Sequence, residues 1–302
     1  MLNATIIGCG DIGLRVGTRL QQLGYSVTAV VRSNESAEQL MTQGFEAVCR
    51  DLDQPNLTLP PITPASLLFY FAPPTTAGEH DLRMTHFLRS LAAKSTQPAR
   101  IVYISTTAVY ADSKGDWIDE HTAPQPANAR GRRRLDAERQ LLEFQCQQPA
   151  TAISILRVAG IYSANRLPFR QLKAGQPVLA LSIAPCSNRI HAEDLARICI
   201  AAALNTTQPL AIFNVSDGNP GSISQYFQAV AETFNLSPAP EINWREAQAQ
   251  LSPAMLSYLK ESKRIDSRRL ATELGITLHY PTLEAGLRQC VEELKDGGHS
   301  SS

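Results

Sequence analysis

The stretch Ala4-Thr5-Ile6-Ile7-Gly8-Cys9-Gly10-Asp11-Ile12-Gly13 decides the fold of this chain. An apolar run that starts almost at the first residue breaks into three glycines with the spacing G-x-G-x-x-G, and apolar residues at helical spacing follow. A strand, a tight turn and a helix in this order are typical of a dinucleotide-binding site. Glycines also make ordinary turns, but the flanking strand and helix favour the binding interpretation.

Each glycine of this turn has its own expected role. Gly8 permits the sharp turn, Gly10 lets backbone N–H groups approach a pyrophosphate with no Cβ in the way, and Gly13 lets the helix pack close to the strand. The helix N-terminus adds unpaired N–H groups and the positive end of its dipole. The cofactor-binding residues predicted here are Gly8, Gly10, Asp11, Ile12 and Gly13.

A second β-rich run, residues 25–32, follows the first helix and completes a strand–helix–strand unit. Sites for NAD usually place Asp or Glu about 20 residues after the glycines, where it accepts a hydrogen bond from the ribose 2′-OH. This chain has Arg32 there, with Ser33 beside it. A cation suits the 2′-phosphate, so we predict NADP as the cofactor. The alternative is a solvated arginine at a strand end, which leaves NAD possible.

Strands and helices alternate through the first half of the chain, which predicts an α/β fold with a doubly wound parallel sheet, the Rossmann fold. Further strands are expected at 45–52, 66–71, 100–110, 150–162 and 211–215, and helices at 36–44, 80–94, 128–146, 222–234, 245–260, 268–274 and 283–294. Residues 189–194 lead into another helix that runs up to Leu204, and 163–189 is expected to be irregular apart from 177–181. We predict a dinucleotide-binding domain at 1–162, to which 190–217 returns. A smaller α/β substrate-binding part is expected at 163–189 and 218–296, and a disordered tail at 297–302.

Composition limits the possible partners and location. The 302 residues are 43% apolar and carry 28 basic and 28 acidic side chains, so the net charge is zero. This balance gives no support to nucleic-acid or membrane-surface binding. The six cysteines form no C-x-x-C pair and show no metal-site spacing. With no basic segment before the first strand and no long apolar run, we expect a cytoplasmic protein without a metal.

Six motifs occur in order along nearly the whole chain. They are Gly8-x-Gly10-x-x-Gly13, Asp51-Leu52-Asp53, Ile104-Ser105-Thr106-Thr107-Ala108-Val109-Tyr110, Leu156-Arg157-Val158-Ala159-Gly160-Ile161-Tyr162, Arg189-Ile190-His191-Ala192-Glu193-Asp194-Leu195-Ala196 and Phe213-Asn214-Val215-Ser216-Asp217-Gly218. With them the chain resembles the extended short-chain dehydrogenase/reductases, the NAD-dependent epimerase/dehydratase group that acts largely on nucleotide sugars. The G-x-G-x-x-G form, in place of the group's usual G-x-x-G-x-x-G, suggests an atypical branch.

The resemblance implies roles for further residues. Asp51 and Leu52 would contact the adenine ring, and Ala72 and Pro73 would line the channel for the ribose and nicotinamide. Thr106 stands at the position of the group's catalytic Ser or Thr; the alternative is a β-branched residue that only ends a strand. The resemblance also suggests a homodimer.

The chain departs from this group at the catalytic pair. These enzymes carry Tyr-x-x-x-Lys at the start of the next helix, where Tyr exchanges a proton with the substrate and Lys lowers the pKa of that Tyr. Aligning the segment after this motif puts Arg130 at the Tyr position and Arg134 at the Lys position. Arginine stays charged and has no acceptor, so Arg130 is no general base. It could polarise a carbonyl or bind an anion, and Arg134 could hold ribose hydroxyls; plain surface charge is the alternative for both.

Three other residues could supply a proton. Tyr110 and Tyr162 follow strands, and periodicity favours packing tyrosines with satisfied hydroxyls. His191 resembles the group's motif histidine and is interpreted as structural. Two functions follow: an NAD(P)-binding, epimerase-like oxidoreductase that acts on a nucleotide sugar or another anionic small molecule, or a non-catalytic NADP(H)-binding sensor.

Overall fold

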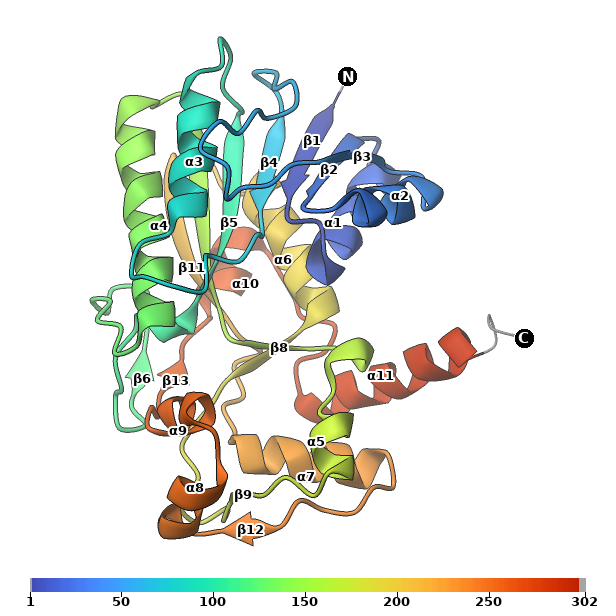
Figure 1. Cartoon of the computed structure of the whole chain (residues 1–302), viewed down its shortest axis with the longest axis vertical. Coiled ribbons are helices and arrows are strands. Elements are labelled where there is room, and N and C mark those ends of the chain that lie inside the picture. Colours follow the sequence, from blue (N-terminus) through green and yellow to red (C-terminus); the bar gives the residue numbers. More distant parts are fainter. Residues whose placement is uncertain (1, 299–302) are drawn as a thin grey trace.

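A seven-stranded sheet forms the centre of the computed structural model, which describes residues 2–298 (Figure 1). The strand order is β11-β7-β5-β4-β1-β2-β3, and every neighbouring pair is parallel. The strands are β1 (Asn3–Ile7), β2 (Ser26–Val31), β3 (Glu46–Cys49), β4 (Leu67–Tyr70), β5 (Arg100–Thr106), β7 (Ala152–Val158) and β11 (Leu210–Val215). The predicted α/β fold with a doubly wound parallel sheet is confirmed.

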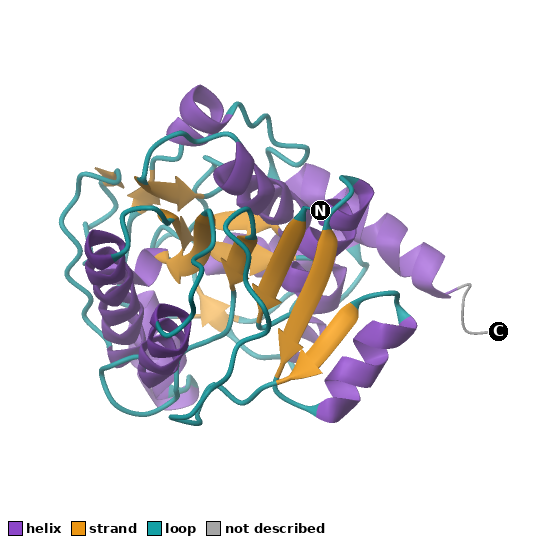
Figure 2. Ribbon diagram, turned by 90° about the horizontal axis from the view of Figure 1, so that it is seen from above, coloured by secondary structure: helices purple, strands orange, loops and turns teal. Residues whose placement is uncertain are grey.

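Helices cover both faces of this sheet (Figure 2). On one face, α3 (Leu82–Ala92) and α4 (Ala129–Gln147) bury residues such as Phe87 and Leu141 against β4 and β5. On the other face lie α1 (Asp11–Gln22), α2 (Asn34–Thr42), α6 (Ala192–Leu204) and α10 (Arg269–Leu274). Because both faces are covered, the central strands read as almost unbroken apolar runs, and all four residues of β4 are buried.

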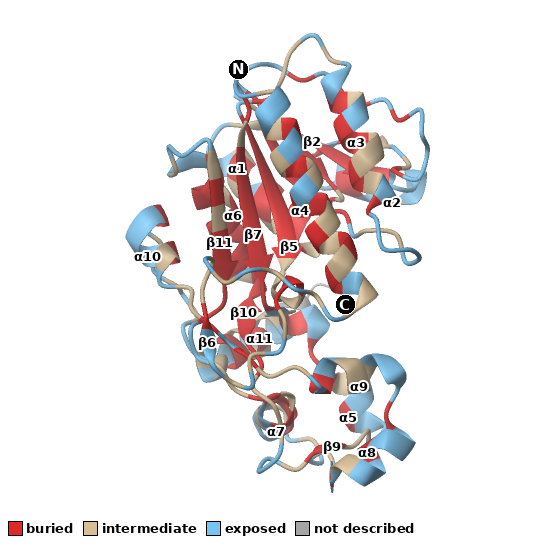
Figure 3. Ribbon diagram, turned by 90° about the vertical axis from the view of Figure 1, so that its left-hand side faces the viewer, coloured by how far each residue is buried: buried red, intermediate tan, exposed pale blue. Residues whose placement is uncertain are grey.

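Short strand pairs lie between the sheet and a smaller second part or, for β9 and β12, within that part, which lies below the sheet in Figure 1 and Figure 3. The pairs are β8 (Gly160–Tyr162) with β10 (Arg189–His191), β9 (Val178–Leu179) with β12 (Glu241–Ile242), and β6 (Trp117–Ile118) with β13 (Arg264–Ile265). The second part also holds α5 (Phe169–Lys173), α7 (Ile223–Thr233), α8 (Trp244–Gln250), α9 (Pro253–Leu259) and α11 (Leu283–Gly298). Its two apolar clusters are separate from those of the sheet.

The structure differs from the sequence prediction in four places. The helix expected at 245–260 is two helices, because Ser252 caps a new N-terminus and Pro253 stands at its first position. The strand expected at 150–162 is interrupted at Ala159, after which β8 leaves the sheet to pair with β10. Although 218–296 was assigned to the smaller part, α10 packs on the sheet with α6 and β11. Of the predicted tail, 297 and 298 belong to α11 and 299–302 lie outside the described residues.

Among residues 2–298, no helix is both long and apolar enough to cross a lipid bilayer.

Candidate functional site

The sheet has a topological switch point between β1 and β4. From β1 the chain moves outward through β2 to β3, and then returns to β4 on the other side of β1. In open α/β sheets a crevice forms at the carboxyl ends of the two strands that flank such a point, and ligands bind there. Gly8 follows β1 at this crevice and Ala72 follows β4.

The geometry of the three glycines fits the turn of a dinucleotide site. Gly8 has φ +84°, and a Cβ atom on it would stand 2.6 Å from the Ala72 backbone nitrogen. A Cβ on Gly10 would meet nothing within 4 Å, which leaves its outer side open. A Cβ on Gly13 would stand 3.1 Å from Ile6 Cγ2, so α1 packs tightly on β1 at that residue.

A cavity of about 140 Å³ opens beside this turn. It brings together six residues that the sequence analysis predicted to bind the cofactor: Gly8, Arg32, Asp51, Leu52, Ala72 and Pro73. Ser33 is absent from its lining; the Ser33 hydroxyl instead accepts from the Ser36 N–H at 3.2 Å and caps α2. The N-terminus of α2 therefore begins directly after Arg32.

Two more arginines line this cavity that the sequence analysis missed. Arg50 Nε donates to the Thr58 carbonyl oxygen, which holds its side chain beside β3. Arg83 binds both carboxylate oxygens of Asp53, at 2.6 and 2.7 Å, and this hydrogen bonding lowers the pKa of Asp53. The exposed Arg32 guanidinium, by contrast, makes no hydrogen bond or ion pair within residues 2–298. Of the three arginines that line this cavity, Arg32 is thus the one whose side chain has no partner within residues 2–298.

The position of Arg50 could have been predicted. Cys49 on β3 pairs with Val31 on β2, and the Arg50 N–H donates to the Val31 carbonyl oxygen at 2.8 Å. The residues that follow two neighbouring parallel strands lie side by side, so Arg50 belongs next to Arg32. Arg83 comes from α3, and no local signal links it to this crevice.

A second cavity, of about 400 Å³, opens at the carboxyl end of β5. It is lined by Thr106 and by Thr107 of the 3₁₀ turn η1 (Thr107–Val109), together with Arg130 at the start of α4. Gly131 allows the start of α4 to lie this close to η1, because a Cβ on Gly131 would stand 2.3 Å from the Ala108 carbonyl oxygen. The structure therefore brings Thr106 and Arg130 to one cavity.

The second part of the chain closes this cavity from the other side. Its contributions are Asn188, Ala254, Ser257, Tyr258, Glu261 and Lys263. The buried Lys263 ammonium donates to Glu261 at 2.7 Å and to the Tyr110 carbonyl oxygen at 3.0 Å. Five of these residues, from Ala254 to Lys263, lie more than 120 positions after Arg130 in the sequence, and no sequence motif predicts them.

The arginines at the start of α4 divide into two kinds. Arg132 pairs with Glu79, Arg133 donates to the Gly78 carbonyl oxygen, and Arg134 donates to the Ile104 carbonyl oxygen at 2.9 Å. Arg134 also donates to the Tyr103 hydroxyl, so it braces β5 and does not line either cavity. Of these four arginines, only Arg130 has no hydrogen-bond or ion-pair partner among residues 2–298. Partial removal from water and the nearby Arg134 charge lower the pKa of Arg130.

A buried polar network supports the floor of this cavity. Glu138 of α4 accepts from Arg157 at 2.8 Å and from Ser105 at 2.5 Å. Arg157 also donates to the Tyr110 hydroxyl, which donates in turn to Asn214 at 2.8 Å. Because Ser105 precedes Thr106, this network fixes the end of β5.

The three other candidates for proton transfer lie away from the cavity surface. Tyr110 is buried with a satisfied hydroxyl, as expected, and burial raises its pKa. Tyr162 is also buried, but its hydroxyl has no hydrogen-bond partner among residues 2–298, so the expected satisfied hydroxyl is wrong there. His191 is fully buried between Tyr162 and Tyr280, its Nδ1 accepts from the Glu193 N–H, and burial lowers its pKa to about 4.

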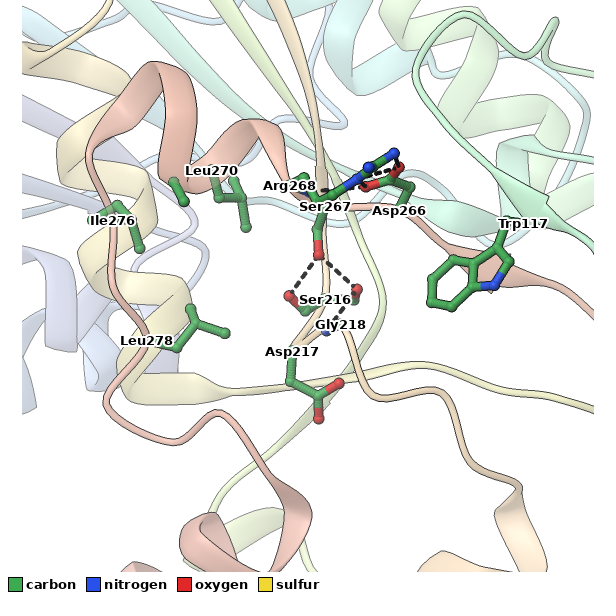
Figure 4. Close-up of a pocket in the computed structure, with 11 residues that line it drawn as sticks. Trp117, Ser216, Asp217, Gly218, Asp266, Ser267, Arg268, Leu270, Ile276 and Leu278 are labelled. Atoms are coloured by element: carbon green, nitrogen blue, oxygen red, sulfur yellow. Dashed lines mark hydrogen bonds and ion pairs between the residues drawn. The ribbon is translucent and has the colours of Figure 1, made fainter.

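A third cavity, of about 660 Å³, lies outside both of these (Figure 4). Ser216 and Ser267 join by hydrogen bonds in its middle, and Asp266 pairs with Arg268 at its edge. These four polar residues thus bind one another in pairs, the Asp217 carboxylate accepts from the Asn219 N–H, and nothing in the lining identifies a ligand.

Comparisons with known proteins find similar sequences and similar folds. The model of the family described as ketopantoate reductase PanE/ApbA matches residues 4–127, which is less than half of the chain. Protein YeeZ of Escherichia coli K12 is 24% identical over 292 residues, which cover 93% of this chain and 97% of that protein.

Three solved structures share the fold over 97–98% of this chain and 99% of theirs. A functionally unknown conserved protein from Silicibacter pomeroyi is 27% identical, with a TM-score of 0.82. MoeE5 in complex with UDP-glucose and NAD is 21% identical, with a TM-score of 0.76. The human epimerase family protein SDR39U1 with NADPH is 15% identical, with a TM-score of 0.73. The chain therefore shares its Rossmann fold with a protein solved with NAD and with an epimerase family protein solved with NADPH.

Proposed function

We propose that this chain is an NADP-binding, epimerase-like oxidoreductase that acts on a nucleotide sugar or another anionic small molecule. The observation that carries the proposal is the position of the two cavities. One opens at the carboxyl ends of β1, β2 and β4, and the other at the end of β5 in the same sheet. A dinucleotide bound across the switch point would hold its adenosine in the first cavity and direct its nicotinamide end toward the second.

The residues of the first cavity fit NADP. Gly8 approaches Ala72 too closely for any side chain, which is the backbone cradle such a cofactor needs. Arg32 is an unpartnered cation that follows β2, and Arg50 is a second cation beside it. Guanidinium groups bind phosphate strongly, whereas a ribose 2′-OH favours a carboxylate, so both arginines favour NADP over NAD.

In the second cavity Arg130 is the proposed ligand for the substrate's anionic group. Its guanidinium has no partner within residues 2–298, and its position on α4 faces the cavity that Thr106 lines. The Thr106 hydroxyl is in place to hydrogen-bond the reacting oxygen of the substrate. A nicotinamide cofactor supplies redox chemistry at carbon. Arg130 can stabilise negative charge on oxygen, but it cannot remove a proton.

The test has two stages. Isothermal titration calorimetry with NADPH and NADH measures cofactor binding, and NADPH is expected to bind more tightly. Absorbance at 340 nm then follows NADPH oxidation over a panel of nucleotide sugars and small carbonyl acids, with Arg130→Gln as the comparison.

The second candidate is a non-catalytic NADP(H) sensor, which the absence of the Tyr-x-x-x-Lys pair favours. Tight NADPH binding without turnover over the whole panel would support the sensor. Failure to bind either dinucleotide would refute both candidates.

A further inference from the structure

Asp11, the first residue of α1, holds two arginines. Its carboxylate accepts from Arg15 Nε at 3.1 Å and from Arg166 Nε at 2.9 Å. Arg15 lies one turn further along α1, whereas Arg166 ends the 3₁₀ turn η2 (Ala164–Arg166) in the second part of the chain. An arginine from the second part thus lies directly over the glycine turn.

The two arginines are held very differently. Arg15 also donates to Glu193 of α6 and to Glu293 of α11, so three carboxylates fix it in place. Arg166 has Asp11 as its one partner among residues 2–298, and its side chain is 40% exposed. Arg166 is therefore free to exchange this partner for another anion, while Arg15 still neutralises Asp11.

The N-terminus of α1 would place such an anion next to Asp11. The first N–H groups of a helix have no acceptor within it, and Gly10 leaves the space in front of them open. A pyrophosphate bound there lies within a side-chain length of the Asp11 carboxylate. The two negative groups repel each other, and a mobile cation between them lowers the cost.

We propose that Arg166, which the second part of the chain supplies, is a ligand of the cofactor's pyrophosphate. When no cofactor is bound, Asp11 holds the Arg166 side chain in position. This inference rests on the proposed function, since it requires a dinucleotide at the glycine turn. It adds a residue from outside the Rossmann half to the cofactor site. It also explains why η2 carries an exposed arginine directed at that turn.

The test compares two ligands and three variants by isothermal titration calorimetry. NADPH contains the pyrophosphate, whereas adenosine 2′-monophosphate contains only the adenosine and 2′-phosphate portions. Arg166→Gln is the test variant. Arg170→Gln is the matched control, because Arg170 is exposed on nearby α5 and its side chain has no partner among residues 2–298.

Arg166→Gln is expected to weaken NADPH binding about tenfold, as for loss of one charge-assisted hydrogen bond, and to leave adenosine 2′-monophosphate binding unchanged. Arg166→Lys keeps the charge, and its affinity for NADPH is expected to lie between those of Arg166→Gln and the unmodified protein. Arg170→Gln should bind both ligands normally. Retained binding of the smaller ligand also shows that the variant is folded.

Three results overturn the inference. The first is that Arg166→Gln binds NADPH as tightly as Arg170→Gln does. The second is that Arg166→Gln weakens both ligands equally, which indicates a general loss of structure. The third is that titrating adenosine 2′-monophosphate or NADPH into the unmodified protein gives no more heat than titrating it into buffer. In that case the proposed function itself fails.

Discussion

Gly8 lies so close to Ala72 that a Cβ atom on Gly8 would stand 2.6 Å from the Ala72 backbone nitrogen and 2.7 Å from its Cα. The two residues follow β1 and β4, the strands on either side of the switch point. This contact closes the bottom of the crevice at the switch point with backbone alone. Any side chain at position 8 would push β4 away from the glycine turn.

The first prediction compares Gly8→Ala with Gly24→Ala. Both glycines have a positive φ, +84° and +83°, but a Cβ on Gly24 would meet nothing within 4 Å. Gly24→Ala should therefore cost about 1–2 kcal/mol in the free energy of unfolding, for backbone strain alone. Gly8→Ala should cost about 1–3 kcal/mol more, for the added overlap. Urea denaturation measures both, and equal losses would contradict the close contact with Ala72.

The sequence allowed the central sheet to be predicted because its strands are short apolar runs between helices with clear periodicity. It did not reveal β6, β12 and β13, which have two residues each and pair with distant segments. Nor did it reveal that the run ending at Tyr162 leaves the sheet, since the residues on both sides of Ala159 are equally apolar. Tertiary pairing, not local propensity, decides such short strands.

The lining of the first cavity was largely predictable, because the glycine turn and the strand ends are local features of the chain. The second cavity was only half predictable. Thr106 and Arg130 follow from motif positions, but Tyr258, Glu261 and Lys263 reach them through the fold of the second part. Arg134 illustrates the opposite case: its position suggested the cofactor ribose, yet its guanidinium binds the Ile104 carbonyl oxygen inside the protein.

The second prediction tests the cofactor preference. Arg32→Gln should weaken NADPH binding more than tenfold, since one charge-assisted contact to the 2′-phosphate contributes roughly 1.5–3 kcal/mol. NADH has no such phosphate, so its binding should stay the same. Arg89→Gln is the control, because Arg89 is exposed on α3 and has no side-chain partner within residues 2–298. Calorimetric titration gives all the affinities, and an equal loss for NADPH and NADH would contradict a 2′-phosphate site.

The third prediction concerns the pH dependence of stability. Burial lowers the pKa of His191 from its ordinary 6.5 to about 4, so the unfolded chain binds a proton in this range that the folded protein does not. The contribution of neutral His191 to the free energy of unfolding is fully present above pH 6.5 and is lost as the pH falls toward 4. The expected loss is about 3 kcal/mol.

His191→Asn is the matched variant, because asparagine also caps a helix N-terminus as His191 does for α6. Urea denaturation at pH 7, 5.5 and 4.5 should show a smaller loss of stability in the variant than in the unmodified protein. Parallel pH profiles for the two proteins would show that His191 is not the group responsible.

The last prediction separates Arg130 from Arg134, the two arginines that the sequence alignment puts in place of Tyr and Lys. Arg134 makes charge-assisted hydrogen bonds to the Ile104 carbonyl oxygen and the Tyr103 hydroxyl, and its guanidinium lies over the Tyr103 ring. Arg134→Gln should therefore lower the free energy of unfolding by about 2–3 kcal/mol. Arg130→Gln removes a charge that has no partner among residues 2–298, so it should change the free energy of unfolding by less than about 0.5 kcal/mol. If denaturation shows the reverse, then Arg130 supports the fold, and the substrate role proposed for it fails.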